Sequence, residues 1–156
     1  MTHSDAAAAT VATIVVGYGP GSENDHALVA AADLARRLAA RLWVVHVACL
    51  EDYPVDPDAA DWEERARDEL AEHRDHVARL LAGRGVGWDY ETRRGDPADE
   101  LCRVADEHDA LLIAVGTRGE GLRTVIPRLF EPSVSHAVIH YQHRPVLVIP
   151  PPDMRH

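Results

Sequence analysis

Two closely spaced glycines, Gly116 and Gly119, follow the apolar run 110–115. Such a run is typical of a buried strand, and glycines at its end let backbone N–H groups approach a phosphate closely. Further along the chain, residues 133–135 open a predicted helix, and the N-terminus of a helix carries a partial positive charge. The two segments are typical of the two sides of a nucleotide site. Directly before the second segment stands Pro132, which has no N–H to offer a phosphate.

A second glycine-rich loop, 17–22, follows the β-branched run 11–16. Apolar runs and helical periodicities alternate along the chain, which predicts a single doubly wound α/β domain with a mostly parallel sheet and helices on both faces. Ligands of such sheets bind beyond the carboxyl ends of the strands, so the loops 17–22 and 116–121 are the expected walls of a crevice. The predicted strands are 11–16, 42–47, 86–92, 110–115 and 145–149, and the predicted helices are 27–38, 62–80, 97–105 and 133–141.

The chain of 156 residues has the length of one domain and a formal net charge of −10. We assign the domain to residues 11–152, a disordered tail to residues 1–10 and a short tail to residues 153–156. The acidic balance disfavours nucleic acid and anionic membranes as partners. No apolar run reaches the ~18 residues of a membrane span, and the N-terminus lacks the pattern of a signal peptide. We therefore expect a cytoplasmic protein.

No arrangement of side chains in the sequence predicts catalysis. All sixteen basic residues are arginine, which excludes a P-loop lysine and a Schiff base. Ser133 has no base placed beside it by the sequence, and we interpret it as a helix-start residue rather than a nucleophile. We expect no enzyme activity. Cys49 and Cys102 lack a CxxC pattern and are expected to be reduced and buried, with a disulfide between them as the alternative.

Histidines and aspartates offer two candidates for a metal site. His136 and His140 are four residues apart on a predicted helix, a spacing that suits a metal, but no carboxylate is in register with them. The aspartates of the segment 52–61 could attract a cation, but such clusters are typical of a solvated loop. We interpret His46, in a predicted strand, and His73, on the apolar face of a predicted helix, as core residues. No bound metal is expected.

Taken in order, these segments resemble the universal stress protein family over residues 13–150. The resemblance is carried by the segments 14–17, 25–28, 45–47, 94–98, 112–119, 133–135 and 144–149. It implies an adenine nucleotide α-hydrolase-like fold with a five-stranded sheet of order 3-2-1-4-5. Members of the family commonly dimerise through the last strand, which implies a homodimer that pairs through Val146–Ile149. Some members bind ATP and others do not.

The ATP-binding members of the family share the signature G-x2-G-x9-G-[S/T]. Gly116 and Gly119 match its first half, but twelve residues, 120–131, separate Gly119 from the next matching position, which is Pro132. These members also carry an aspartate after the first strand, and Gly19 occupies that place here. The resemblance implies a nucleotide site formed by Gly17, Gly19, Val47, Val115, Gly116, Arg118, Gly119, Ser133, Val134 and Ser135.

The two departures from the family pattern predict a weakened site. Each lost hydrogen bond costs roughly 0.5–1.5 kcal/mol, so two or three losses weaken binding about a hundredfold. We therefore expect a small stress-response regulator that binds ATP or another adenine nucleotide weakly or not at all. Three alternatives stay open: a fully ATP-binding member of the family, an interaction module whose crevice holds no nucleotide, and a slow ATP hydrolase.

Overall fold

Five parallel strands form one sheet in the order β3-β2-β1-β4-β5, which confirms the predicted strand order. The computed structural model describes residues 11–19, 22–48, 60–116 and 144–150. The strands are β1 (Thr13–Gly17), β2 (Arg41–Ala48), β3 (Trp88–Arg94), β4 (Leu112–Gly116) and β5 (Val146–Ile149). The described helices are α2 (Ser22–Arg37), α3 (Trp62–Leu81) and α4 (Pro97–Glu107). The predicted helix 133–141 and both predicted tails lie outside the described residues.

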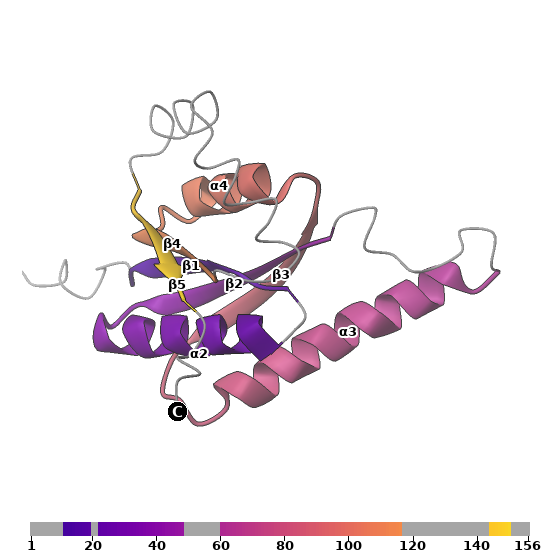
Figure 1. The fold of residues 1–156 in the computed structure, drawn as a ribbon, viewed down its shortest axis with the longest axis horizontal. Helices are drawn as coiled ribbons and strands as arrows, with labels where there is room; N and C mark the ends of the chain where they lie inside the picture. Colours follow the sequence, from indigo (N-terminus) through magenta and orange to yellow (C-terminus); the bar gives the residue numbers. More distant parts are fainter. Residues whose placement is uncertain (1–10, 20–21, 49–59, 117–143, 151–156) are drawn as a thin grey trace, which may run out of the picture.

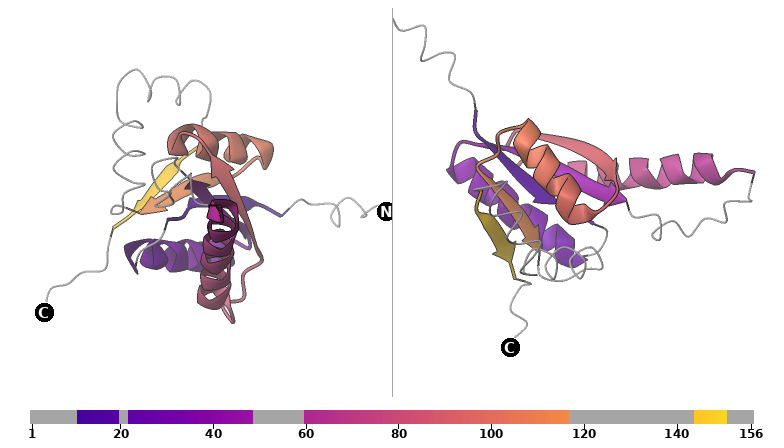
Figure 2. Two further views of the ribbon diagram at one scale, coloured as in Figure 1. Left: turned by 90° about the vertical axis from the view of Figure 1, so that its right-hand side faces the viewer. Right: turned by 90° about the horizontal axis from the view of Figure 1, so that it is seen from above.

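Helices cover both faces of the sheet, with α2 on one side and α4 on the other (Figures 1 and 2). On the face of α2 and α3, the buried side chains include Ile14, Val16, Leu28, Leu42, Val44 and Val77. On the face of α4, they include Val15, Val45, Leu101, Val104, Ile113 and Val115. Successive residues of β1 and β2 thus face opposite apolar layers, which explains why these strands are apolar without alternation.

α3 extends past the edge of the sheet, on the right of Figure 1. Its C-terminal half packs on the core through Val77 and Leu81. Trp62 is exposed, because the N-terminal end of α3 lies beyond the sheet. Leu38 is exposed as well, since α2 ends at Arg37. No helix in the described part of the chain combines the length and apolar character that a membrane span requires.

α4 begins as the sequence predicts. Asp96 is the N-cap, its side chain accepts a hydrogen bond from the Asp99 N–H at 3.2 Å, and Pro97 occupies the first helical position. Of the two cysteines, Cys49 lies outside the described residues. Cys102, in α4, is half-buried rather than buried, and burial is the largest cause that raises its pKa to about 11. The thiol is therefore protonated at neutral pH.

α2 ends in a Schellman turn with an alanine in the left-handed conformation. The Ala40 N–H donates to the Ala35 carbonyl at 2.8 Å, and the Ala39 N–H donates to the Arg36 carbonyl at 3.2 Å. Ala39 has a φ of 53°. This conformation costs a residue with a Cβ about 1–2 kcal/mol, which is why glycine is the usual residue at this point.

We predict that Ala39→Gly raises the free energy of unfolding by about 0.5–1 kcal/mol. Glycine removes the strain of the Cβ, and the greater freedom of the unfolded chain offsets part of the gain. Urea denaturation of the two proteins measures the difference. Ala82→Gly is the matched control: Ala82 follows α3 with a φ of −59°, so glycine there should lower the free energy of unfolding. A less stable Ala39→Gly protein would contradict the strain argument.

Candidate nucleotide site

The carboxyl ends of β1 and β4 lie side by side at the centre of the sheet. β1 pairs with β2 on one edge and with β4 on the other, so the order of the strands reverses between β1 and β4. This is the switch point at which open α/β sheets bind their ligands. Gly17 ends β1 and Gly116 ends β4. The structure thus brings together two predicted site residues, and we refer to this end of β1, β2 and β4 as the candidate site.

Packing against α4 leaves little room for a side chain at Gly17. A Cβ at this position would lie 3.1 Å from Leu101 Cδ1 and 3.6 Å from Val115 Cγ1. The absent side chain therefore lets Leu101 of α4 approach the end of β1 closely. Val115 is buried in the same layer of the core as Leu101. Gly17 and Val115 thus place α4 against the sheet directly beneath the candidate site.

Gly19 has space for a side chain. The nearest atom to a Cβ built there is Asn24 Nδ2 at 3.5 Å, an ordinary van der Waals contact. Asp25, in the first turns of α2, does not replace the carboxylate that is missing at position 19. Its Oδ1 accepts a hydrogen bond from the Tyr18 hydroxyl at 2.9 Å, and its Oδ2 accepts one from His76 Nε2 at 2.9 Å. Both carboxylate oxygens are already engaged by the protein.

His46 is a buried, hydrogen-bonded residue, as predicted. Its Nδ1 donates to the carbonyl oxygen of Tyr18 at 3.1 Å, and because a carbonyl only accepts, this nitrogen carries the proton. Its ring meets that of His73 edge-on, with 5.3 Å between the ring centroids. The N–H of Tyr18 donates to the Val45 carbonyl at 2.9 Å. Residues of β2 thus form hydrogen bonds with both the N–H and the carbonyl of Tyr18, which precedes Gly19.

Sequence reasoning missed the contacts that join Tyr18, Asp25 and His76. These residues belong to three separate segments, and 51 positions separate Asp25 from His76. Burial first, and then the hydrogen bond to Asp25 and its negative charge, raise the pKa of Tyr18 well above its ordinary value. The hydroxyl therefore stays protonated and remains a donor. The signal that could have indicated this role is a tyrosine placed between two glycines at the end of an apolar run.

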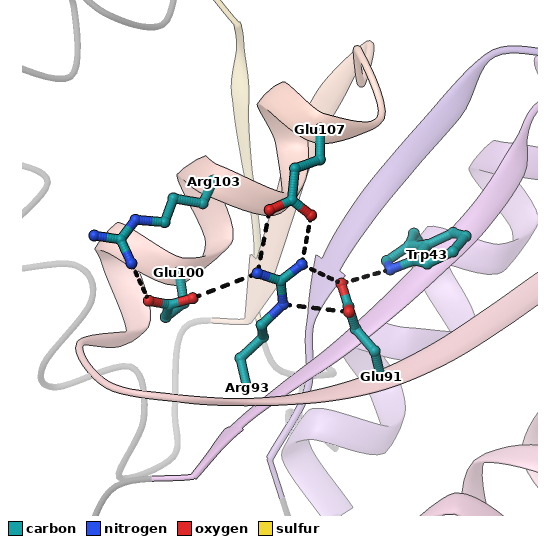
Figure 3. Close-up of polar contacts among 6 residues, drawn as sticks. All are labelled: Trp43, Glu91, Arg93, Glu100, Arg103 and Glu107. Carbon is teal, nitrogen blue, oxygen red and sulfur yellow. Dashed lines mark hydrogen bonds and ion pairs between the residues drawn. The ribbon is translucent and has the colours of Figure 1, made fainter.

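Val47 lies next to an arginine that carboxylates surround. Val47 pairs with Arg93 across β2 and β3. Two nitrogens of the Arg93 guanidinium donate to Glu107 of α4, and its Nε and Nη2 lie 3.2 and 3.3 Å from oxygens of Glu91 (Figure 3). An oxygen of Glu100 lies 3.8 Å from Nη1. Three carboxylates thus balance the charge of Arg93, which leaves it a poor partner for a phosphate.

One group of described side chains has the spacing of a metal site: Glu91, Glu107 and His108. Arg93 lies between its two carboxylates and supplies positive charge there (Figure 3). The His108 ring lies against Trp43 with 3.8 Å between centroids, and Trp43 Nε1 donates to Glu91 at 2.9 Å. Glu91, Glu107 and His108 therefore have partners within the protein, and their arrangement is explained without a bound metal ion.

Five predicted site residues lie in the described part of the chain: Gly17, Gly19, Val47, Val115 and Gly116. Arg118, Gly119, Ser133, Val134 and Ser135 lie outside the described residues, together with Pro132, His136 and His140. The phosphate side of the site is therefore a prediction from sequence, and the structure places the side formed by β1, β2 and the end of β4.

The profile of the universal stress protein family matches residues 10–150 of the chain. The chain belongs to this family. A universal stress protein of Methanocaldococcus jannaschii is 30% identical over 125 residues, which make up 78% of this chain and 72% of the relative.

Solved structures share the fold. A protein of the universal stress protein family from Burkholderia pseudomallei has a TM-score of 0.62 and 29% identity, covering 89% of this chain and 96% of its own. A universal stress protein from Archaeoglobus fulgidus, solved in complex with dAMP, has a TM-score of 0.60 and 22% identity, covering 90% of this chain and 98% of its own. This likeness confirms the predicted adenine nucleotide α-hydrolase-like fold.

The contact between Arg93 and Glu107 predicts a pH-dependent contribution to stability. The hydrogen bonds from Arg93 hold the pKa of Glu107 below its usual range. A carboxylate with a lowered pKa stabilises the fold above its unfolded pKa of about 4.3, and this contribution is lost as the pH falls through the folded pKa. Arg93→Gln should therefore be less stable than the wild type at pH 7, and the difference should shrink below about pH 4.

Denaturation at several pH values and a carbon-13 NMR titration of Glu107 measure these two effects. Arg65→Gln is the matched control, because Arg65 pairs with Asp61 on exposed surface at the start of α3. It should change stability little at any pH. A Glu107 carboxyl that titrates identically in the wild type and in Arg93→Gln would show that the contact does not lower its pKa.

Proposed function

We propose that this universal stress protein is a small, non-enzymatic, cytoplasmic regulator that binds adenine nucleotides weakly at the candidate site. The observation that carries the proposal is the position of Gly17 and Gly116 at the carboxyl ends of two adjacent strands, with Gly19 just beyond. Backbone groups at such a switch point are open to a nucleotide. The Archaeoglobus fulgidus protein with the same fold was solved with dAMP, which supports this class of ligand.

Two features of the chain support weak rather than tight binding. Gly19 offers no carboxylate to the nucleoside, and the carboxylate of Asp25 is engaged by Tyr18 and His76. Pro132 offers no N–H where the family signature places a glycine. Each missing contact costs roughly 0.5–1.5 kcal/mol, so the combined loss weakens binding by about a hundredfold.

Calorimetric titration with ATP, ADP and AMP, with and without magnesium, tests the proposal. We expect binding of adenine nucleotides with affinities about a hundredfold weaker than micromolar. A micromolar or tighter dissociation constant for ATP would contradict the weakened site. A protein that binds none of the three nucleotides would favour the alternative of an interaction module.

Gly19→Asp should raise the affinity for adenosine and its nucleotides by roughly 3- to 10-fold, the effect of one added hydrogen bond. The side chain fits, because the nearest atom to its Cβ is Asn24 Nδ2 at 3.5 Å. Gly87→Asp is the matched control: it adds the same charge just before β3, at the opposite end of the sheet, where a Cβ meets nothing within 4 Å. Equal affinities of the two variants for adenosine would refute the role of position 19.

A restored phosphate side should favour the triphosphate. A variant that lacks three residues of 120–131 and carries Pro132→Gly regains the glycine and the spacing of the signature. We expect it to bind ATP measurably more tightly, with a larger gain for ATP than for adenosine, since the restored donors face phosphates. Titrations of the deletion alone and of Pro132→Gly alone separate the two contributions. A gain as large for adenosine as for ATP would contradict this assignment.

We further propose a homodimer that pairs through β5. This apolar strand is at the edge of the sheet, and Val146 is 37% exposed. An apolar edge strand favours pairing with a second copy around a two-fold axis. Val146→Asp should therefore give a monomer by light scattering while leaving the fold intact. Val11→Asp, at an exposed position before β1, is the control. A Val146→Asp protein that stays dimeric would exclude this interface.

A further inference from the structure

Three side chains beside the candidate site form a continuous hydrogen-bonded chain, the polar relay: Tyr18, Asp25 and His76. The Tyr18 hydroxyl donates to Asp25 Oδ1 and His76 Nε2 donates to Asp25 Oδ2, each at 2.9 Å. Tyr18 directly follows β1, Asp25 lies in α2 and His76 lies in α3. The relay therefore ties α3 to the residue that precedes Gly19.

The polar relay is partly buried. Tyr18 is 6% exposed, and the side chains of Asp25 and His76 are 24% and 40% exposed. If the buried Tyr18 hydroxyl lost its acceptor, it would be left unpaired at the full cost of its desolvation. The position of the Tyr18 side chain therefore depends on that of Asp25. Asp25 in turn is held from the side of α3 by His76. The side chain of Tyr18 is thus fixed by contacts that begin on α3.

The backbone of Tyr18 is held by β2 in addition to the contacts of its side chain. Its N–H donates to the Val45 carbonyl at 2.9 Å, and its carbonyl accepts from His46 Nδ1 at 3.1 Å. With its side chain and both backbone groups held, Tyr18 determines where the chain leaves the sheet. Gly19 has no side chain with which to anchor itself, so its place follows from that of Tyr18.

We propose that the polar relay positions Gly19 at the candidate site, with Tyr18 as the positioning residue and His76 as the contact through which α3 acts. This role rests on the proposed function, because Gly19 bears on affinity if the candidate site takes an adenine nucleotide. α3 contributes none of the predicted site residues, yet through His76 it sets the first wall of the site. Loss of the contact between His76 and Asp25 therefore changes nucleotide affinity, although His76 is not one of the predicted site residues.

Four variants separate positioning from stability. Tyr18→Phe removes the hydroxyl, His76→Leu removes the donor on α3, and His76→Gln keeps an N–H donor close to the place of Nε2. Val77→Ala is the matched control, because Val77 is the neighbour of His76 on α3, is fully buried and lies outside the relay. The Gly19 amide is observed by nitrogen-15 relaxation, which needs no ligand.

We expect the order parameter of the Gly19 amide to fall from about 0.85 to below about 0.6 in Tyr18→Phe and His76→Leu. It should return to the wild-type value in His76→Gln and keep that value in Val77→Ala. The dissociation constant for AMP should rise about 3- to 10-fold in Tyr18→Phe and His76→Leu, the effect of one lost hydrogen bond. It should stay unchanged in His76→Gln and Val77→Ala.

Order parameters of Gly19 at the wild-type value in Tyr18→Phe and His76→Leu overturn the positioning role, whether or not AMP binds. An unchanged affinity for AMP beside a disordered Gly19 overturns it as well, as does an equal loss of affinity in Val77→Ala. If the wild type binds no adenine nucleotide, the proposed function fails. The relaxation data then decide on their own whether the relay positions Gly19.

Discussion

The burial of Ile14, Val15 and Val16 in β1 is the constraint on which the other elements depend. Ile14, Val15 and Val16 have no exposure to solvent, and β2 and β4 occupy both edges of the strand. A strand that is enclosed on both faces and both edges needs helices above and below it, which α2 and α4 supply. The chain can then leave the strand at its carboxyl end only between these layers. That exit is where Gly17, Tyr18 and Gly19 lie, so the placement of the candidate site follows from the burial of the strand.

Different polar interactions join the helices to the sheet on its two faces. On the face of α4, the guanidinium of Arg93 is held by Glu91 and Glu107, which ties β3 to the last turn of the helix. On the face of α2 and α3, a hydrogen bond from the neutral Tyr18 hydroxyl to the Asp25 carboxylate ties the end of β1 to α2. The Tyr18 hydroxyl is buried and needs its partner, because an unpaired buried hydroxyl costs about 1–3 kcal/mol. Each helix layer is thereby fixed to the sheet beside the site.

The sequence was sufficient for the features that depend on neighbours along the chain. The apolar run around Val15 predicted a buried strand, the predicted helix 97–105 begins where α4 begins, and the strand order followed from the family resemblance. It was insufficient where a side chain meets a partner far along the chain. The spacing of Asp25 and His76 carries no sign of their contact. Gly17 illustrates a further limit. From the sequence, Gly17 was explained by the close approach of a ligand, whereas the structure adds a packing reason, the close approach of Leu101.

Charge determines how the candidate site can treat a phosphate. The chain carries a formal net charge of −10, and the arginine next to Val47 is balanced by carboxylates. A triphosphate therefore meets unfavourable long-range electrostatics, without compensation from Arg93. Under the proposed function, its binding depends on backbone N–H groups and on the positive end of the helix predicted from residue 133, which are short-range contacts. In such a site each N–H matters more, and a proline at position 132 removes one. A ligand with a single phosphate loses less from that proline than ATP does, so the proposed function implies a preference of the candidate site for AMP over ATP.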